Sequence, residues 1–462
     1  MQFDKIQNIY LIGIGGIGMS ALARYFLFIG KNVAGYDKTK TSLTDKLSDE
    51  GIAVHYTDDP NLIPAFMIDN ADIENTLVIY TPAIPEEHKE LTFFKKNNFT
   101  LLKRSEVLGM ISRKKTSIAV AGTHGKTTIS SMIAHLLYAS EKSCNAFLGG
   151  ISKNYNTNLL LSESSPFVVA EADEFDRSFL HLEPQIAIIS AVDADHLDIY
   201  GTYEEVKKSF SAFVEKIQTN GSLIIKKGIN IELPKNKFYH IYKYSLNSET
   251  DFFARNIKIE ANRYVFDFIT PLGTAIESIT CGIPGIINVE NAVAALAAAF
   301  LAGVPEKNMR DAMHTFKGNN RRFDIQVETN NIVYIDDYAH HPEEIKAFIS
   351  SVKEMYPGKK ITGIFQPHLF SRTKDFADDF AKSLSMLDEL ILTEIYPARE
   401  KAMPGVTSEL IFDKVSIKNK ILCSKTEITG KINKNNTEVL LTMGAGDIDL
   451  YVSEIKQLCL NA

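Results

Sequence analysis

A glycine-rich segment that contains a lysine, residues 121–128, has the residue types best suited to chemistry in this chain. It follows an apolar stretch at 116–120 and precedes a helical pattern at 129–137. Backbone N–H groups in a glycine-rich turn between a strand and a helix can surround a phosphate. Lys126 would then reach the outer phosphates, and the Thr127 hydroxyl would hold a magnesium ion. The segment therefore predicts a site for ATP or GTP.

This loop is shorter than the common phosphate loop. The pattern G-x-x-x-x-G-K-[ST] would place its first glycine at position 120, where the chain has Val120. The residues that we expect to hold the nucleotide are Gly122, Thr123, His124, Gly125, Lys126, Thr127 and Thr128.

Carboxylates and a histidine follow the next two predicted strands. Glu171 comes directly after the stretch 167–170, and an acidic group that includes His196 follows the stretch 186–191. A carboxylate at the C-terminal end of a strand beside a phosphate loop can bind magnesium or order its water. A solvated acidic turn is the alternative for Glu171 and its neighbours. The two strand ends together favour a site that needs two cations.

Polar residues also follow two strand-like stretches in the last third of the chain. Asp337 and His340 follow the first stretch, His368 follows the second, and Arg372 opens a helical pattern. The carboxyl ends of neighbouring parallel strands form a rim where ligands bind. Arg322, just upstream, could reach a phosphate from a different domain. Charged strand ends in three parts of the chain predict one site in the clefts between domains.

A second glycine cluster lies near the N-terminus. Gly13, Gly15 and Gly18 match G-x-G-x-x-G between a predicted strand and a helix, with Asp37 ending the next predicted strand. On this stretch alone, a nicotinamide- or flavin-dependent dehydrogenase is the favoured interpretation. The motif itself requires a diphosphate at a helix N-terminus, and a nucleotide-sugar diphosphate fits it equally well. Glycines that serve strand–helix packing alone are the minor alternative.

Composition limits the compartment and the partners. The chain has 462 residues, of which 45% are hydrophobic and 23% charged, and its net charge of -7 argues against nucleic acid as a partner. No stretch is long and apolar enough to span a bilayer, so we expect no membrane association. Glycines interrupt the apolar stretch 10–23, which argues against a signal peptide. Four cysteines without metal-type spacing fit free thiols in a reducing cytoplasm.

Strand-like and helical stretches alternate along most of the chain, which predicts an α/β protein with parallel sheets. We expect domains at 1–106, 107–317 and 318–462. The β-rich region 222–282, which contains the alternating stretch 257–268, predicts an antiparallel patch. The predicted strands are 6–12, 32–37, 52–56, 76–84, 99–103, 116–120, 167–170, 186–191, 332–335, 361–365, 390–392 and 439–441. The predicted helices include 20–29, 86–96, 289–302 and 306–316.

Taken together, these motifs resemble the Mur ligases, the ATP-dependent amide-forming enzymes of bacterial cell-wall precursor synthesis. The pattern covers nearly the whole chain and comprises G-T-H-G-K-T-T (122–128), E-A-D-E-F-D-R-S-F (171–179), D-A-D-H-L-D (193–198), N-V-E-N-A-V-A-A (288–295), R-R-F-D (321–324), D-D-Y-A-H-H-P-E-E (336–344) and Q-P-H-L-F-S-R-T (366–373). Two positions depart from the family pattern: Ile287 stands where a histidine is usual, and Leu369 where an arginine is usual.

The resemblance implies a fold and a reaction. The expected fold has a Rossmann-like UDP-binding domain, a central ATPase domain with a parallel sheet and a small antiparallel sheet, and a C-terminal Rossmann-like domain for the amino acid. The expected reaction uses ATP and Mg²⁺ to join L-alanine to the lactyl carboxylate of UDP-N-acetylmuramate through an acyl phosphate. A monomer or a homodimer is expected.

The resemblance also assigns roles to residues. For the nucleotide and metal, these are Lys126 and Thr127 on the phosphates, Thr127 and Glu171 on a first magnesium, His196 on a second, Asn291 facing the adenine, and Arg322 and Asp337 completing the nucleotide site. For the other substrates, these are Gly15, Gly16, Gly18 and Asp37 for UDP, Asp173, Ser178 and Phe179 for the muramoyl part, and His340, His368 and Arg372 near alanine and the reacting phosphoryl group. Lys126, His196, His340 and Arg372 are expected to serve catalysis.

Three alternatives remain open at this point. A recycling ligase that joins a whole tripeptide to the same sugar nucleotide shares most of the motifs. A nicotinamide-dependent oxidoreductase explains the first glycine cluster but leaves 116–128 and 171–198 without a role. A non-catalytic nucleotide-binding switch predicts ATP binding without turnover.

Overall fold

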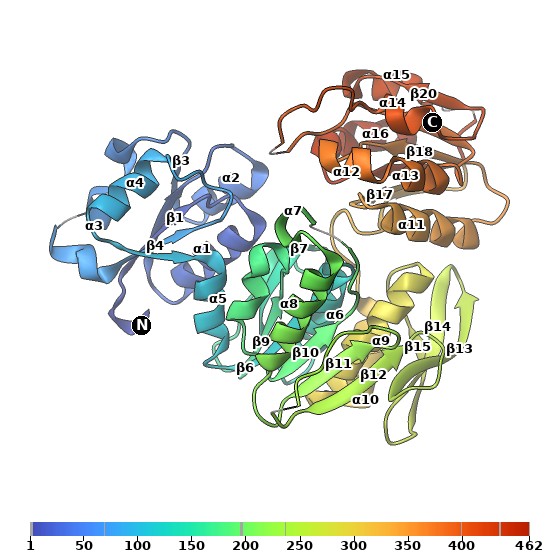
Figure 1. Ribbon diagram of the computed structural model, residues 1–462. Helices are drawn as coiled ribbons and strands as arrows, with labels where there is room; N and C mark the ends of the chain where they lie inside the picture. Colours follow the sequence, from blue (N-terminus) through green and yellow to red (C-terminus); the bar gives the residue numbers. More distant parts are fainter. Residues whose placement is uncertain are drawn as a thin grey trace. The chain divides into compact units, whose positions relative to one another are not determined.

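Parallel strands joined by helices make up most of the chain, as the alternating pattern predicts. The computed structural model describes residues 3–68, 70–194, 197–235, 237–398, 400–433 and 436–461, whose strands form three sheets (Figure 1). The α/β prediction is confirmed. Contacts divide the chain into two compact units: Met1–Asn256, Phe266–Ile279 and Asn291–Phe316 form the first, and Ile257–Val265, Thr280–Glu290 and Lys317–Ala462 form the second. The three domain boundaries stay predictions.

The first sheet has parallel strands in the order β3-β2-β1-β4-β5. Its strands are β1 (Asn8–Ile12), β2 (Asn32–Tyr36), β3 (Ala53–His55), β4 (Thr76–Tyr80) and β5 (Thr100–Lys103). The helices of this region are α1 (Ile17–Phe28), α2 (Ser42–Asp49), α3 (Ala65–Ile68), α4 (Lys89–Lys96) and α5 (Arg104–Ser112).

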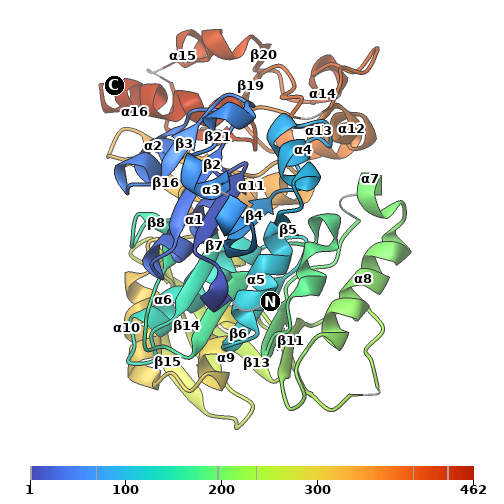
Figure 2. The same cartoon turned by 90° about the vertical axis from the view of Figure 1, so that its left-hand side faces the viewer.

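Successive residues of β1 pack on opposite faces of this sheet. Ile9 and Leu11 belong to the same core cluster as α1 and α5, whereas Tyr10 and Ile12 pack with α3 and α4. Helices therefore cover both faces, as Figure 1 and Figure 2 show. This arrangement places the first glycine cluster at the carboxyl edge of the sheet, between β1 and α1.

The second sheet has the order β15-β14-β13-β12-β11-β10-β6-β9-β7-β8. Its strands are β6 (Thr116–Ala121), β7 (Asn145–Ser152), β8 (Thr157–Leu160), β9 (Phe167–Glu171), β10 (Ile186–Ile189), β11 (Ser222–Lys226), β12 (His240–Ser245), β13 (Phe252–Glu260), β14 (Arg263–Ile269) and β15 (Ala275–Thr280). The helices are α6 (Lys126–Tyr138), α7 (Leu197–Tyr200), α8 (Tyr203–Glu215), α9 (Ile286–Leu301) and α10 (Glu306–Thr315). Helix α6 is buried from Thr127 to Leu137 because β7 and β9 pack on one side of it and α10 on another.

The antiparallel prediction for 222–282 is wrong in part. Strands β11, β12 and β13 pair in parallel. The stretch 257–268 is two strands, because Ala261 and Asn262 turn the chain with φ of 46° and 59°. Two consecutive residues with positive φ form the type I′ turn of a hairpin. Alternation identifies a strand but leaves the direction of its partner open, and the connection from β11 to β12 is long enough for a parallel pair.

The third sheet has the order β16-β17-β21-β18-β19-β20, with β16 antiparallel at one edge and the other pairs parallel. Its strands are β16 (Asp324–Glu328), β17 (Val333–Asp337), β18 (Ile361–Phe365), β19 (Glu389–Leu392), β20 (Lys420–Leu422) and β21 (Val439–Met443). Its helices are α11 (Pro342–Met355), α12 (Phe370–Asp375), α13 (Ala377–Leu384), α14 (Glu409–Phe412), α15 (Ile428–Lys431) and α16 (Val452–Leu460).

Most element ends agree with the sequence patterns, with one clear exception. Strand β4 ends at Tyr80 rather than at 84. Pro82 has no N–H to donate to a neighbouring strand, which explains the early end. Among the helices that the structure describes, none has the length and apolar character to cross a membrane.

Candidate active site

The predicted phosphate loop joins β6 to α6 in a conformation that requires glycine at two positions. Gly122 has φ of 140° and Gly125 has φ of 84°, and Gly125 is the N-cap residue directly before α6. A Cβ added to Gly122 would overlap Ser190 Oγ and lie 2.9 Å from the backbone nitrogen of Ala191. Val120 is still part of β6 and fully buried. The loop is therefore short because its strand continues to Ala121.

Lys126 points into this loop. Its Nζ donates to the Gly122 carbonyl and to Glu174 Oε1, both at 2.8 Å. Burial lowers the pKa of Lys126, but the carboxylates of Glu174, Asp173 and Glu171 raise it further, so its pKa lies above the usual value. Lys126 is therefore a cation at the place where outer phosphates are predicted.

Glu174 is the residue of this site that sequence reasoning missed. It lies in the acidic run 171–176 and is almost fully buried, whereas Asp176 is part-exposed and pairs with Lys103 at 3.3 Å. Burial raises the pKa of Glu174, and Lys126 lowers it. The kink at Asp176 and Arg177, with φ of 52° and 55°, separates the buried acid from the exposed one.

The other residues of the loop are tied to the strand end of β10. Thr123 Oγ1 donates to Asp193 Oδ2 at 3.0 Å, and His124 Nε2 lies 3.4 Å from the same oxygen. Ser190 Oγ donates to the His124 carbonyl. The predicted set of loop residues is completed by two buried threonines in the first turn of α6, Thr127 and Thr128.

The structure describes two of the three predicted metal ligands, Glu171 and Thr127. Glu171 ends β9, and its carboxylate lies across β7, where a Cβ added to Gly149 would overlap it. Thr127 is the second residue of the neighbouring helix α6. A hydroxyl and a carboxylate are oxygen ligands of the kind that Mg²⁺ binds while keeping several waters. His196 and Asp195 lie outside the described residues. No group of three or more His, Cys, Asp or Glu side chains suited to a metal occurs in the part of the chain that the structure describes.

Asn291, the residue predicted to face adenine, lies beside the phosphate loop. It is on α9, and its Oδ1 would be 2.9 Å from a Cβ added to Gly125. Its side chain is therefore close to the start of α6, and its contact with adenine stays a prediction.

The first glycine cluster is closed by an acid from the next strand. Asp37 Oδ2 accepts from the backbone N–H of Gly15 at 2.7 Å, and a Cβ on Gly15 would meet that carboxylate at 2.8 Å. Gly16 is the N-cap residue directly before α1, and no side chain caps the helix there. A Cβ on Gly18 would meet Arg104 Nη1 at 2.5 Å. The cluster thus has the helix N-terminus that a diphosphate needs.

The three residues predicted near the muramoyl part differ in access. Asp173 is part-exposed and lies 3.6 Å from Arg104 Nη2. Ser178 is half-buried. Phe179 is fully buried and stacks on Phe213 with ring centroids 5.0 Å apart. The Phe179 ring therefore belongs to the hydrophobic core, and its position does not support the predicted contact with substrate.

In the second unit, Asp337 holds two backbone segments at the carboxyl end of β17. Its oxygens accept from the N–H groups of Phe323 at 2.6 Å and Ala339 at 2.7 Å. Burial raises the pKa of Asp337 to about 6, although Arg322 and these hydrogen bonds lower it. The Arg322 guanidinium lies 4.9 Å from the centre of the Tyr338 ring. Arg322 therefore lies near Asp337, and their role in the nucleotide site stays a prediction.

His340, His368 and Arg372 gather at the same edge of the third sheet. The rings of His340 and His368 are 5.9 Å apart, and Arg372, buried in α12, helps to lower the pKa of His340. Burial is the main cause, and it lowers that pKa to about 4. His340 Nδ1 lies 3.0 Å from the Tyr338 carbonyl, which can only accept. A neutral His340 therefore carries its proton on Nδ1 and leaves Nε2 as an acceptor.

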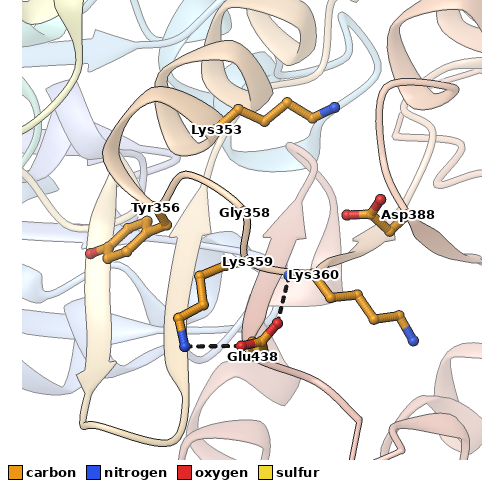
Figure 3. A pocket seen from close by; sticks show the side chains of 7 residues that line it. All are labelled: Lys353, Tyr356, Gly358, Lys359, Lys360, Asp388 and Glu438. Atoms are coloured by element: carbon orange, nitrogen blue, oxygen red, sulfur yellow. Dashed lines mark hydrogen bonds and ion pairs between the residues drawn. The ribbon is translucent and has the colours of Figure 1, made fainter.

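A cavity of about 400 Å³ lies at the opposite edge of this sheet, where β18 and β21 begin. Figure 3 shows its lining, with Glu438 bonded to the Lys359 ammonium and to the Lys360 backbone. Lys360 also pairs with Glu389 at 3.0 Å. None of the predicted site residues lines this cavity, and its charges largely neutralise one another.

Family models match the chain in three consecutive segments. They describe the Mur ligase family catalytic domain over 8–116, the Mur ligase middle domain over 120–299 and the Mur ligase glutamate ligase domain over 321–448. The chain belongs to the Mur ligase family. The family prediction from the motifs is confirmed.

Individual proteins that are similar to the chain have more specific names than the family models. The chain is 52% identical over 459 residues to the UDP-N-acetylmuramate–L-alanine ligase of Parabacteroides distasonis, covering 99% of this chain and 98% of that one. It is 47% identical to the enzyme of that name from Flavobacterium johnsoniae, covering 99% of each. Among solved structures it resembles the UDP-N-acetylmuramate–alanine ligase of Thermotoga maritima, with a TM-score of 0.81, 26% identity and coverage of 98% and 100%.

Proposed function

We propose that this protein joins L-alanine to the lactyl carboxylate of UDP-N-acetylmuramate, using ATP and forming ADP and phosphate. The observation that carries this proposal is the likeness over nearly the full length to ligases of that name, at 52% and 47% identity. The two glycine-rich loops add support, because each lies between a strand and a helix in a form suited to phosphate groups.

The first half of the reaction transfers the γ-phosphoryl group of ATP to the carboxylate. A carboxylate is a poor acyl donor, and an acyl phosphate provides phosphate as the leaving group. Lys126, a cation inside the loop, offsets negative charge that builds on the transferred group. Thr127, Glu171 and His196 would hold magnesium in this proposal, and the ion would supply further positive charge at the phosphates. Asn291 would contact the adenine.

In the second half, the amine of L-alanine attacks the acyl phosphate. The new C–N bond forms as the C–O bond to phosphate breaks, and the amine loses a proton. Arg372 is proposed to pair with the alanine carboxylate. His340 Nε2, unprotonated because the pKa of His340 is lowered to about 4, is an acceptor within the same cluster. His368 lies beside it.

Around the two reacting groups, other residues would hold the substrates. Gly15, Gly16, Gly18 and Asp37 form the proposed UDP site, with Asp173 and Ser178 toward the sugar. Arg322 and Asp337 are proposed to complete the nucleotide site. The cysteines Cys144, Cys281, Cys423 and Cys459 are free thiols, which fits the reducing cytoplasm that we propose as the compartment. The proposed assembly is a monomer or a homodimer.

The test is phosphate release from ATP in the presence of UDP-N-acetylmuramate and one amine at a time: L-alanine, glycine, L-serine or the tripeptide. We expect the highest kcat/KM with L-alanine and no release when the sugar nucleotide is omitted. Release with the tripeptide alone would replace this function by that of a recycling ligase. ATP binding without release under any condition would indicate a nucleotide-binding switch.

A further inference from the structure

Arg104 is a cation that lies across the first glycine cluster and that no motif singles out. It begins α5, directly after the edge strand β5. A Cβ added to Gly18 would stand 2.5 Å from Arg104 Nη1, 3.1 Å from Cδ and 3.3 Å from Cζ. The third glycine of G-x-G-x-x-G often allows close packing of helix and strand. In this protein, it leaves room for an arginine side chain to cross the first turn of α1.

The guanidinium adds to positive charge that is already present at this place. Helix α1 has Gly16 as its N-cap and no side-chain cap, and its first backbone bond runs from the Ser20 N–H to the Gly16 carbonyl. The N–H groups before Ser20 therefore have no partner within the helix, and the helix dipole is positive there. The first turn of α1 carries no acidic residue. An anion between α1 and Arg104 would meet both the N–H groups and the guanidinium.

Asp173 pairs with Arg104 but does not occupy all the N–H donors of its guanidinium. The ion pair is long, at 3.6 Å from Nη2 to Oδ2, and both side chains are part-exposed. A guanidinium has five N–H donors in a planar fork, so one loose pair leaves donors for a ligand. Asp173 also accepts from the N–H of Phe175, which fixes it at the start of its turn. The pair thus holds the guanidinium over Gly18 while leaving its donors accessible.

We propose that Arg104 binds the diphosphate of the sugar nucleotide and that Asp173 positions the guanidinium for this contact. The inference rests on the proposed function, because UDP-N-acetylmuramate is the ligand. Two parallel N–H bonds from the guanidinium to phosphate oxygens complement the N–H groups at the start of α1. A lysine would place a point charge there but could not make the paired contact.

The preceding residue provides a matched control. Lys103 carries the same charge and pairs with Asp176 at 3.3 Å, in the same acidic turn that Arg104 meets through Asp173. Lys103 is not among the atoms nearest to any glycine of the cluster. Removing its charge changes the net charge beside the acidic turn by the same amount, and in this proposal it removes no contact with the ligand.

The experiment measures binding of UDP, UMP and uridine by calorimetry to the full-length protein and three variants. We expect Arg104→Gln to weaken UDP about 10- to 100-fold, the range for hydrogen bonds to charged groups. Arg104→Lys should weaken UDP less, and Lys103→Gln should stay within about 2-fold because an exposed pair contributes little. Uridine binding should be equal in all four proteins. The difference in UDP affinity between Arg104→Gln and the wild type should also become smaller at high salt.

Two further measurements separate binding from folding. ATP binding to Arg104→Gln should equal that of the wild type, which shows that the site around Lys126 is intact. Gly18→Ala keeps the arginine but pushes its guanidinium aside, so it should weaken UDP in the same direction. In the ligation assay, Arg104→Gln should raise KM for UDP-N-acetylmuramate and leave kcat nearly unchanged.

Equal UDP affinity in Arg104→Gln and the wild type would overturn the inference. An equal loss in Lys103→Gln would also overturn it, because general charge would then explain the effect. These results would leave the proposed function standing if the wild type still ligates L-alanine. A wild type that binds UDP through Arg104 but does not ligate L-alanine would contradict the proposed function alone.

Discussion

The two glycine-rich loops, 13–18 and 121–126, lie in the same unit and join a parallel strand to a helix, but they obtain their charge in different ways. In the second loop the lysine that follows the glycines folds back, and Glu174 balances it. The first loop has no cation of its own, and Arg104 reaches it from the start of a different helix. The second loop thus contains its own cation, whereas the first is completed by a residue distant in sequence.

The carboxylates that contact the two loops, Asp37 and Glu174, also differ in what they bind. Asp37 accepts from a backbone N–H of the first loop and so fixes the main chain. Glu174 touches the second loop through the lysine side chain. A carboxylate on the main chain sets the shape of a loop, and a carboxylate on the lysine sets the position of a charge. The difference fits a first loop that binds and a second loop that takes part in transfer.

The largest effect should follow from removing the cation of the second loop. Lys126→Ala is expected to lower kcat by about 10³-fold or more, because the proposed phosphoryl transfer loses the positive charge inside the loop. Phosphate release measures this loss, and UDP calorimetry should give the wild-type affinity. A parallel loss of UDP binding would show that the two loops are not separate sites and would contradict the division of roles between them.

The glycines of the two loops should differ in what they tolerate. Gly122→Ala forces a side chain into Ser190 at φ of 140° and should lower the free energy of unfolding by about 2–4 kcal/mol. Gly16→Ala adds a Cβ whose nearest neighbour is 3.5 Å away, at an ordinary negative φ, and should cost less than about 1 kcal/mol.

Urea unfolding of the two variants measures this difference. Gly125→Ala, at φ of 84°, should resemble Gly122→Ala rather than Gly16→Ala. Equal stability of the Gly122 and Gly16 variants would mean that the second loop relaxes around a side chain and that its tight form is not required.

Sequence patterns predicted both loops, because each depends on residues that are adjacent in the chain. They also placed the strands on which the loops stand, since buried parallel strands are continuous apolar runs. The patterns do not reveal Arg104, because its proximity to Gly18 depends on how β5 and α5 pack beside α1. The direction of β12 and β13 was missed for the same reason: alternation does not specify the pairing partner.

Within the acidic run 171–176, the sequence alone does not show which carboxylates are buried and which are exposed. The position of Glu171 at the end of a strand favours it as a ligand, although Glu174 is the more buried of the two. The left-handed conformation of Asp176 and Arg177 turns the chain, so that neighbours in sequence face the core and the solvent in turn. The motif that contains Phe179 predicts a contact with substrate, but its ring lies in the core.

The smallest predicted effect tests whether Glu174 acts on the lysine or on the fold. Glu174→Gln keeps an acceptor near Lys126 but removes the negative charge, so the unfolding free energy should fall by about 1–2 kcal/mol. Asp176→Asn is the matched control in the same turn: its pair with Lys103 is exposed, and asparagine tolerates the positive φ, so the change should stay within about 0.5 kcal/mol.

The nucleotide separates the two explanations for Glu174. A phosphate would take over Lys126 in both proteins, so saturating ATP should narrow the stability gap between Glu174→Gln and the wild type. Asp176→Asn should follow the wild type with and without ATP. A gap that stays the same at saturating ATP would mean that Glu174 stabilises the 171–181 turn itself, for which Tyr200 provides a further bond to the Glu174 carbonyl at 2.5 Å. The second loop would then depend on Lys126 alone for its charge, and its contrast with the first loop would rest on the lysine rather than on the acid beside it.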